Sequence, residues 1–480
     1  MKTLIRNSIF MSLFNIFGRA SGVLRYFLLV AFLSEANFAL ITYAFKFGSL
    51  ARAFIDGGLD NLLTRDCARN YDRLSSYGFN GLVIKFILSL IFLGSGFFYL
   101  HDARDMSRYQ IGVVYAAACG SMLLSFAGII RSGFTAIERM EYVFYTNLPA
   151  RALSILLLFG ALYLALPLYY AALAVSFENA LWLVLLWVMS LRFFTLSPVN
   201  FSLRHIYFMV RESLPLAVYS FFTIFYLSLD VLMIEYIMGD PKYVAPYGYA
   251  SLLIEGINML LTGYIIAVYP TFSRLFEQNE AAYQRLFRMS FNLLLAATIP
   301  ASVLLSFWSY GWMNFIRETG DLSGNILQVL TLNLSLNMLN TLLIMVYTSR
   351  NQQGWLVLFA STTLIISFVS NWFLIRWFGQ LGAAWATFLS QLTMLIIMGI
   401  SARRMFALHY PWQKPGRMLL VSLLAGGLTW LIPHLYLLLV PFVYGGLLLF
   451  FIWLFRIVTA EEWQEWRKAL RKESVEDSLE

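Results

Sequence analysis

Five ionisable side chains lie within the first two long apolar stretches of the chain, where a charge is costly. These stretches run from about residue 8 to residue 62, and the ionisable residues are Arg19, Arg25, Lys46, Arg52 and Asp56. A charge in the hydrocarbon of a membrane costs at least about 2.5–3.5 kcal/mol even on lenient insertion scales. We therefore expect these side chains to line a water-filled space. Because four of the five are positive, that space would attract anions.

Depth in the membrane follows from the helical rise of about 1.5 Å per residue. Arg25 and Lys46 would lie about 12 Å from the outer ends of their helices, and Arg19 and Arg52 about 21 Å. The two helices are thus predicted to stack two cations at each of two depths. Arg52 and Asp56 are four residues apart and could pair on one helical face. The alternative to anion binding is a structural ion-pair network or a clamp on backbone carbonyls.

Further charges occur in later apolar stretches. Lys85 and Arg151 enter from the inner ends of their helices, and either contact an anionic headgroup or extend to the surface. Glu178, Asp230 and Glu255 are acidic, and three roles fit them: coupling or gating, a salt bridge between two halves of the protein, or structure alone.

Four more polar side chains have alternative interpretations. Asn333, Asn337 and Asn340 share one helical face and either bind sugar hydroxyls or join neighbouring helices. Glu235 lies close enough to the outer surface to be solvated. We find no metal-ligand cluster, phosphate loop or catalytic serine motif, so the sequence predicts no metal, no cofactor and no catalytic residue.

The elements that position these residues are membrane-spanning helices. The chain has 480 residues, of which 60% are hydrophobic and only 12% charged, and its mean hydropathy is +0.70. This composition is typical of an all-α polytopic membrane protein. Windows of about 20 apolar residues predict about 14 spans. They lie near 8–33, 38–62, 79–100, 109–131, 144–165, 168–191, 212–238, 246–271, 287–310, 324–348, 354–376, 380–402, 416–433 and 435–457.

The positive-inside rule gives the orientation of these spans. With both termini in the cytoplasm, cytoplasmic segments hold roughly four to five times as many Lys and Arg as outer loops. The outer loops are short, the longest being about 310–323. We therefore expect no folded domain outside the membrane.

Matched spacing predicts a duplicated unit of six helices. The predicted domains are an N-terminal lobe (1–195), a cytoplasmic linker (196–211), a C-terminal lobe (212–402), two additional transmembrane helices (403–457) and a cytoplasmic tail helix (458–480). Such repeats place a binding site at the interface between the lobes.

Five segments resemble a known family. They are DGGLDNLLTRDCARN (56–70), ESLPLAVYSFFTIFYLSLDVLMI (212–234), VAPYGYASLLIEGI (244–257), AVYPTFSRLFEQ (267–278) and FGQLGAAWATFLSQ (378–391). In order and topology they are similar to segments of Wzx-type oligosaccharide flippases, in the superfamily of the MurJ lipid II flippases and MATE drug exporters. The motif positions that match are Asp230, Tyr247, Glu255, Pro270 and Arg274.

The resemblance implies two six-helix lobes in a V, alternating access, and a polyprenyl-diphosphate-linked oligosaccharide as cargo. The basic residues of the first two spans would then contact the diphosphate. MurJ-type proteins also carry two extra helices, which the predicted count accommodates. The first two helices do not clearly match the MurJ pattern, so a peptidoglycan precursor is the less favoured cargo.

The expected function is therefore a flippase of the bacterial cytoplasmic (inner) membrane that moves this lipid outward for surface polysaccharide synthesis. Besides this cargo, membrane lipids and polysaccharide polymerase or chain-length proteins would be partners, and no nucleic acid would bind. H+, Na+ or the membrane potential would drive the cycle. The alternatives are a MATE-like exporter of small molecules or drugs and, from another class, an integral-membrane polymerase or acyltransferase. An exporter of cations should have an acidic first lobe, whereas such an enzyme usually needs a large outer loop or an intramembrane histidine.

Overall fold

The computed structural model describes residues 2–71, 73–104, 106–317, 320–432 and 436–455, and every regular element in these ranges is helical. The first half contains α1 (Lys2–Phe32), α2 (Glu35–Asp56), α3 (Leu59–Arg69), α4 (Arg73–Phe98), α5 (Arg108–Ala136), α6 (Met140–Tyr163) and α7 (Leu168–Ser190). The second half contains α8 (Leu203–Met238), α9 (Ala245–Gln278), α10 (Glu280–Phe307), α11 (Ser309–Ile316), α12 (Gly320–Ser349), α13 (Gln353–Phe378), α14 (Gln380–Phe406), α15 (Gln413–Trp430) and α16 (Val440–Leu454). Three short elements are η1 (Tyr99–Ala103), η2 (Pro198–Asn200) and η3 (Pro241–Val244).

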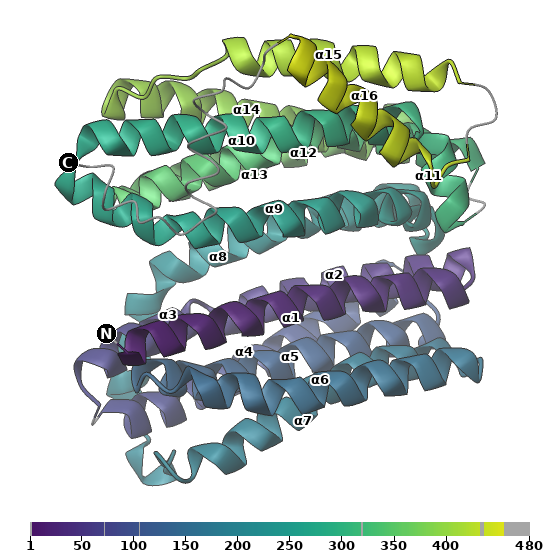
Figure 1. Ribbon diagram of the computed structural model, residues 1–480. Coiled ribbons are helices and arrows are strands. Elements are labelled where there is room, and N and C mark those ends of the chain that lie inside the picture. Colours follow the sequence, from purple (N-terminus) through teal and green to yellow (C-terminus); the bar gives the residue numbers. More distant parts are fainter. Residues whose placement is uncertain (1, 72, 105, 318–319, 433–435, 456–480) are drawn as a thin grey trace.

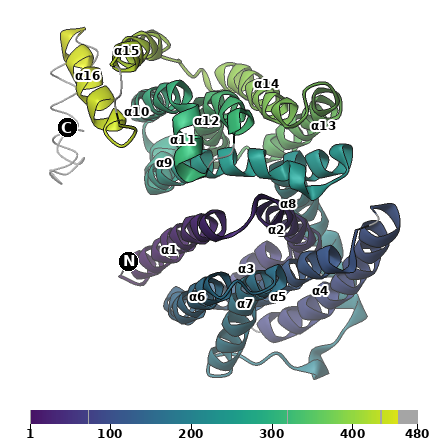
Figure 2. The same ribbon diagram turned by 90° about the vertical axis from the view of Figure 1, so that its right-hand side faces the viewer.

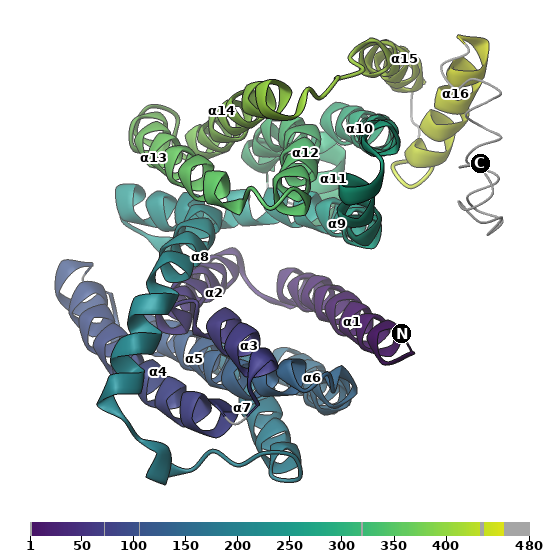
Figure 3. The same cartoon turned by 90° about the vertical axis from the view of Figure 1, so that its left-hand side faces the viewer.

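The long helices form two groups. In Figure 1, α1–α7 lie together in the lower part and α9–α16 in the upper part, with their axes roughly across the view. Helix α8 runs from the lower group to the upper one, as the views along the helices also show (Figures 2 and 3). Helices α15 and α16 lie at the edge of the upper group, beside α10. We call the two groups the first and the second bundle, and we count the end of α8, whose Asp230 bonds to α9, α13 and α14, with the second.

Twelve helices in the described ranges are long and apolar enough to cross a membrane, and they correspond to the first twelve predicted spans. The protein is therefore a multi-pass membrane protein. The last two predicted spans correspond to α15, of 18 residues, and α16, of 15 residues. The predicted outer loop at 310–323 is instead largely helical, because α11 and the start of α12 occupy it. The predicted tail helix at 458–480 lies outside the described residues.

Adjacent glycines divide the second predicted span. Gly57 and Gly58 have φ angles of 50° and 69°, a left-handed conformation that favours glycine. They end α2 and precede α3, so the single predicted helix at 38–62 is wrong. The break places Asp56 in the last turn of α2 and Asp60 in the first turn of α3.

Local sequence explains other helix ends. Ser107 and Gln110 form a reciprocal capping box at the start of α5. Ser202 caps α8 and Asn279 caps α10, each accepting a hydrogen bond from a backbone N–H three residues on. Pro167 separates α6 from α7, as predicted.

Buried side chains show where the two bundles meet. One apolar cluster combines residues of both bundles, including Phe38 of α2 and Tyr249 of α9, whose rings stack with centroids 4.4 Å apart. Two further clusters lie nearer the predicted cytoplasmic ends: one contains residues of the second bundle, and the other contains residues of the first bundle with the start of α8. The bundles therefore share a core towards their predicted outer ends and have separate cores towards the other end.

Candidate functional site

The carboxylate of Glu178 in α7 binds two arginines from different helices. Arg25 of α1 pairs with one of its oxygens, and Nε of Arg151 in α6 lies 3.0 Å from the other. Nε of Arg25 and Nη1 of Arg151 are buried and have no acceptor among the residues that the structure describes. Two guanidinium groups around one carboxylate leave one positive charge in excess. We call these three residues the Glu178 cluster.

Glycine in α1 makes room for this cluster. A Cβ atom at Gly18 would lie 2.9 Å from Nη1 of Arg151, closer than carbon and nitrogen normally approach. The guanidinium of Arg151 also lies over the ring of Phe14, 5.8 Å from its centroid. Arg151 therefore turns towards α1 and α7 rather than extending to the inner surface, which was the alternative.

Lys46 connects the two bundles. Its Nζ lies 3.5 Å from Oε1 of Glu255 in α9 and 3.5 Å from the carbonyl oxygen of Leu227 in α8. The side chain of Glu255 is 53% exposed although the residue lies well inside a membrane-spanning segment. The pair joins α2 to α9, so this partly exposed carboxylate lies at a contact between the bundles.

A second charged group surrounds Lys85 of α4. Its side chain is completely buried, and Nζ donates to Asp56 Oδ1 (2.8 Å), Asp60 Oδ1 (2.7 Å) and the carbonyl oxygen of Ser125 (2.7 Å). Nη2 of Arg131 lies 3.4 Å from Asp60 Oδ2. All three protons of the Lys85 ammonium thus have acceptors, and the side chain does not extend to the surface as one alternative required.

Arg52 lies beside this group without a close carboxylate. Its predicted partner Asp56 pairs with Lys85 instead, and within the described ranges no carboxylate oxygen comes within 4.0 Å of the Arg52 guanidinium. Together with Lys85 and Arg131, Arg52 makes three cations against the carboxylates of Asp56 and Asp60. We call these five residues the Lys85 cluster, which also keeps one positive charge in excess.

The backbone of Arg19 lies in α1, but its side chain lies outside the described part of the structure. Its role as a headgroup contact stays a prediction. The other cations of the first two spans, Arg25, Lys46 and Arg52, all lie on the first bundle.

The carboxylate of Asp230 in α8 accepts hydrogen bonds from three uncharged groups. Tyr247 Oη and Thr387 Oγ1 donate to Oδ2 at 2.6 and 2.7 Å, and Asn371 Nδ2 donates to Oδ1 at 3.0 Å. These groups come from α9, α14 and α13. No described Lys or Arg pairs with Asp230, so here the salt-bridge alternative is not observed. We call these four residues the Asp230 cluster.

The three asparagines of α12 have different environments. Asn340 donates to the side-chain and backbone oxygens of Gln391, at 2.7 and 3.0 Å, and so joins α12 to α14. Asn337 accepts a hydrogen bond from Thr341 on its own helix. Asn333 is buried, and neither of its amide atoms has a partner within the described ranges. Helix joining is thus observed for Asn340.

A contact that the sequence did not predict joins the bundles at their predicted outer ends. Arg104, after η1, binds Glu235 Oε1 of α8 through Nη2 at 2.7 Å and Nε at 3.0 Å. Glu235 is buried, so the expectation that it is solvated is wrong, because depth alone does not reveal a partner. Arg317 donates to the carbonyl oxygens of Val30 and Leu33 near the end of α1. The sequence did contain a signal for this contact, because Arg104 and Arg317 are among the few basic residues of the predicted outer loops.

This arrangement is the fold of MurJ and MATE transporters of the MOP superfamily. The lipid II flippase MurJ, in an inward closed conformation, has a TM-score of 0.73 and 16% identity over 94% of this chain and 98% of its own. An inward-facing multidrug resistance MATE transporter has a TM-score of 0.65 and 12% identity over 81% and 94%. A MOP superfamily transporter from Pyrococcus furiosus has a TM-score of 0.59 and 12% identity over 85% and 96%. At these identities, the likeness establishes the fold alone.

The family is established by the sequence. Residues 4–276 match the family model described as "Polysaccharide biosynthesis protein", and the chain belongs to this family. Comparison with curated protein sequences gives no match.

Proposed function

We propose that this protein is a flippase that moves a polyprenyl-diphosphate-linked oligosaccharide from the inner to the outer leaflet of the bacterial cytoplasmic membrane. The observation that carries the proposal is the Glu178 cluster, in which two arginines share one carboxylate and keep buried donors without acceptors. A buried donor without a partner is costly. A phosphate oxygen would satisfy both the excess charge and these donors.

Arginine suits this task better than lysine. Its planar guanidinium presents several donors and binds phosphate through paired hydrogen bonds. Arg25 and Arg151 approach Glu178 of α7 from two different helices, α1 and α6. A diphosphate with two to three negative charges would compete with Glu178 for the guanidinium groups of Arg25 and Arg151. Arg52 and Lys46 would provide further positive charge. The sugar would occupy the space between the bundles, and the polyprenyl tail would stay in the lipid.

Movement would use the two bundles as lobes. Their shared core at the predicted outer ends and separate cores at the other end suit a state open to the cytoplasm. Opening the outer end would require breaking the Arg104–Glu235 pair and the Arg317 contacts with α1. The pair of Lys46 and Glu255 joins the lobes. A bound headgroup that attracts Lys46 away from Glu255 would therefore help the lobes to move apart. Both termini would lie in the cytoplasm.

The Asp230 cluster is the best candidate for coupling. The Asp230 carboxylate accepts hydrogen bonds from three uncharged groups and can take up a proton, or a small cation once these hydroxyl and amide groups turn to present their oxygens. The cluster joins α8 and α9 to α13 and α14, so its occupancy would change how these helices pack. The driving agent would thus act in the second bundle and the headgroup would bind in the first.

The Glu178 and Lys85 clusters each have one positive charge in excess, which argues against an exporter of cationic drugs. Reconstitution into vesicles separates the two functions, using a fluorescent polyprenyl-diphosphate disaccharide and a cationic dye as substrates. We expect transfer of the lipid, measured by chemical quenching of the outer leaflet, and no accumulation of the dye. Transport of the dye without transfer of the lipid would overturn the proposal.

A further inference from the structure

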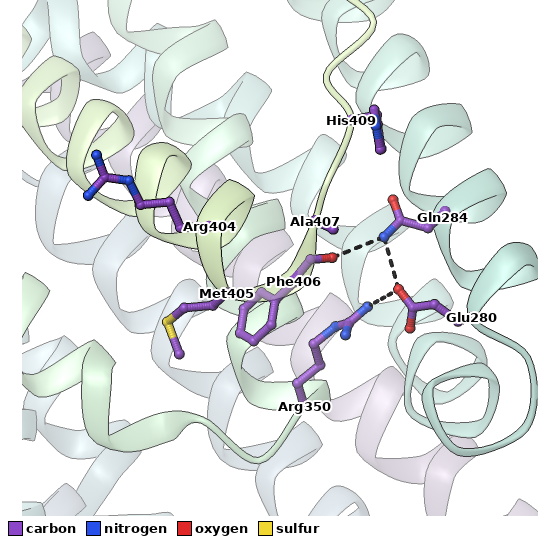
Figure 4. A pocket seen from close by; sticks show the side chains of 8 residues that line it. All are labelled: Glu280, Gln284, Arg350, Arg404, Met405, Phe406, Ala407 and His409. Atoms are coloured by element: carbon purple, nitrogen blue, oxygen red, sulfur yellow. Dashed lines mark hydrogen bonds and ion pairs between the residues drawn. The ribbon is translucent and has the colours of Figure 1, made fainter.

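A polar pocket and an apolar groove meet at the cytoplasmic end of the second bundle, and none of the residues that line them belongs to the clusters described above. The polar pocket has a volume of about 460 Å³ and lies between the start of α10, the end of α12 and the segment after α14 (Figure 4). The groove, also of about 460 Å³, lies between the start of α13 and the end of α14. Arg404 and Met405 line both.

Arg350 forms one side of the polar pocket, where an ion pair and aromatic rings hold its guanidinium in place. Its Nη2 lies 2.6 Å from Glu280 Oε1, and its guanidinium lies over the rings of Tyr283 and Phe406, with centroids at 4.3 and 4.8 Å. Gln284 donates to the same Glu280 oxygen at 2.9 Å and to the carbonyl oxygen of Phe406 at 3.2 Å (Figure 4). These contacts neutralise Arg350 and give the pocket a rigid wall.

Two groups of the pocket have a charge or a hydrogen-bonding atom without a partner. Arg404 is exposed and forms no ion pair within the described ranges, so it gives the pocket one uncompensated positive charge. In Figure 4 its guanidinium points away from Gln284 and Glu280, at the rim. The side-chain oxygen of Gln284 is buried and has no donor in the described part of the chain. The pocket thus has a cation at its rim for one anion and, in its wall, an amide oxygen that would accept from a hydroxyl group once the Gln284 side chain turns.

The groove is suited to a hydrocarbon chain. Ile396, Ile397 and Ile400 line it from α14, and Trp355 lines it from the first turn of α13. All four side chains are exposed. Tryptophan is frequent at membrane interfaces, where its ring lies at headgroup level. A basic site of this kind between helices on the cytoplasmic side is typical of headgroup recognition.

We propose that this pocket and groove bind one anionic glycerophospholipid of the cytoplasmic leaflet. Its phosphate would contact Arg404, a hydroxyl group of its headgroup would donate to Gln284, and one acyl chain would lie along α14 beside Trp355. The single excess charge fits a headgroup with one phosphate, such as phosphoglycerol. The bound lipid would join α10, α13 and α14 at their cytoplasmic ends. This site does not depend on which molecule the protein transports.

Binding of dioleoyl phosphatidylglycerol to the purified full chain tests the site, with phosphatidylethanolamine as the comparison lipid. We expect native mass spectrometry to show preferential retention of phosphatidylglycerol. Arg404→Gln should weaken this binding about tenfold, the loss expected for a charged hydrogen bond to phosphate. Arg403→Gln is the matched control, because this neighbouring exposed arginine lines neither pocket, and should change binding less than about twofold. Equal losses in both variants, or no preference between the lipids, would overturn the proposal.

A second measurement locates the acyl chain and does not rely on Arg404. A phosphatidylglycerol with brominated chains should quench part of the tryptophan fluorescence, and the quenching should fall in Trp355→Phe. Ile400→Trp should fill the groove and weaken lipid binding while leaving the unfolding temperature unchanged. Glycerol 1-phosphate at millimolar concentration should not displace the lipid, because it lacks the chain. Displacement, or unchanged quenching in Trp355→Phe, would contradict a lipid site here.

Discussion

Arg104 holds Glu235 across the predicted outer end of the molecule, with Nη2 and Nε at 2.7 and 3.0 Å from one carboxylate oxygen. Only 2% of the Glu235 side chain and 13% of that of Arg104 are exposed. The same guanidinium also donates to the carbonyl oxygens of Glu235 and Tyr236. One side chain from the first bundle thus binds the end of α8, and in the proposed cycle this contact would break when the outer end opens.

Arg104→Gln should therefore favour opening at the outer end. Removing one partner of a buried ion pair costs about 3–5 kcal/mol, and this cost falls on the closed state alone. With Cys67 and Cys119 replaced by Ser, a cysteine at Thr42, buried in α2, should react at least tenfold faster with an impermeant thiol reagent added outside. Arg108→Gln, at the start of α5, is the control and should leave the rate unchanged. No change in Arg104→Gln would show that the pair does not hold the outer end closed.

The Lys85 cluster should matter mainly for stability. Lys85→Met leaves Asp56 and Asp60 buried without their shared ammonium, at a cost of about 3–5 kcal/mol. We expect a lower unfolding temperature in detergent, and recovery of part of the loss when Asp56 is also changed to Asn, because Asp60 then keeps Arg131 as its partner and the excess charge is unchanged. If Lys85→Met keeps wild-type stability and loses only lipid binding, Lys85 is a headgroup contact instead.

A larger side chain at Gly18 should disturb the Glu178 cluster, because Arg151 packs directly against this glycine of α1. Gly18→Leu should displace the guanidinium of Arg151, because even a Cβ atom would lie 2.9 Å from its Nη1. Binding of a polyprenyl diphosphate should fall about tenfold. Gly22→Leu, one turn on, is the matched control, since a Cβ there meets no atom within 4 Å. Equal effects of the two substitutions would mean that α1 tolerates no bulk at all, and would remove the argument for Arg151.

Asp230 should control how transfer depends on cations. Asp230→Asn keeps the shape and two hydrogen-bonding atoms but removes the charge that would hold a proton or Na+. In vesicles, we expect the mutant to lose any stimulation by a proton or sodium gradient. Glu255→Gln is the comparison, because Glu255 pairs with Lys46 and should alter transfer without altering the gradient dependence. Retained stimulation in Asp230→Asn would place coupling elsewhere.

The sequence predicted the membrane spans well because hydrophobicity over 20 residues is a local property. It could not predict the partners of the charges, which come from helices far apart in the chain. Glu178 and Arg25 are an example, and Lys85 with Asp60 is another. Depth estimates placed Glu235 near the outer surface, but only the position of Arg104 explains its burial. The helix break at Gly57 and Gly58 had a visible signal, since paired glycines often mark a turn.

Binding of lipid diphosphates to the Glu178 cluster is the most direct test of the central claim. The affinity of the purified protein for a polyprenyl diphosphate and a polyprenyl monophosphate should be measured for wild type, Arg25→Gln, Arg151→Gln and Arg139→Gln. The last is the control, an arginine with a 45% exposed side chain outside the cluster. We predict that wild type and Arg139→Gln prefer the diphosphate, and that Arg25→Gln and Arg151→Gln each bind it about tenfold more weakly. Equal affinity of all four proteins for the diphosphate would contradict the account.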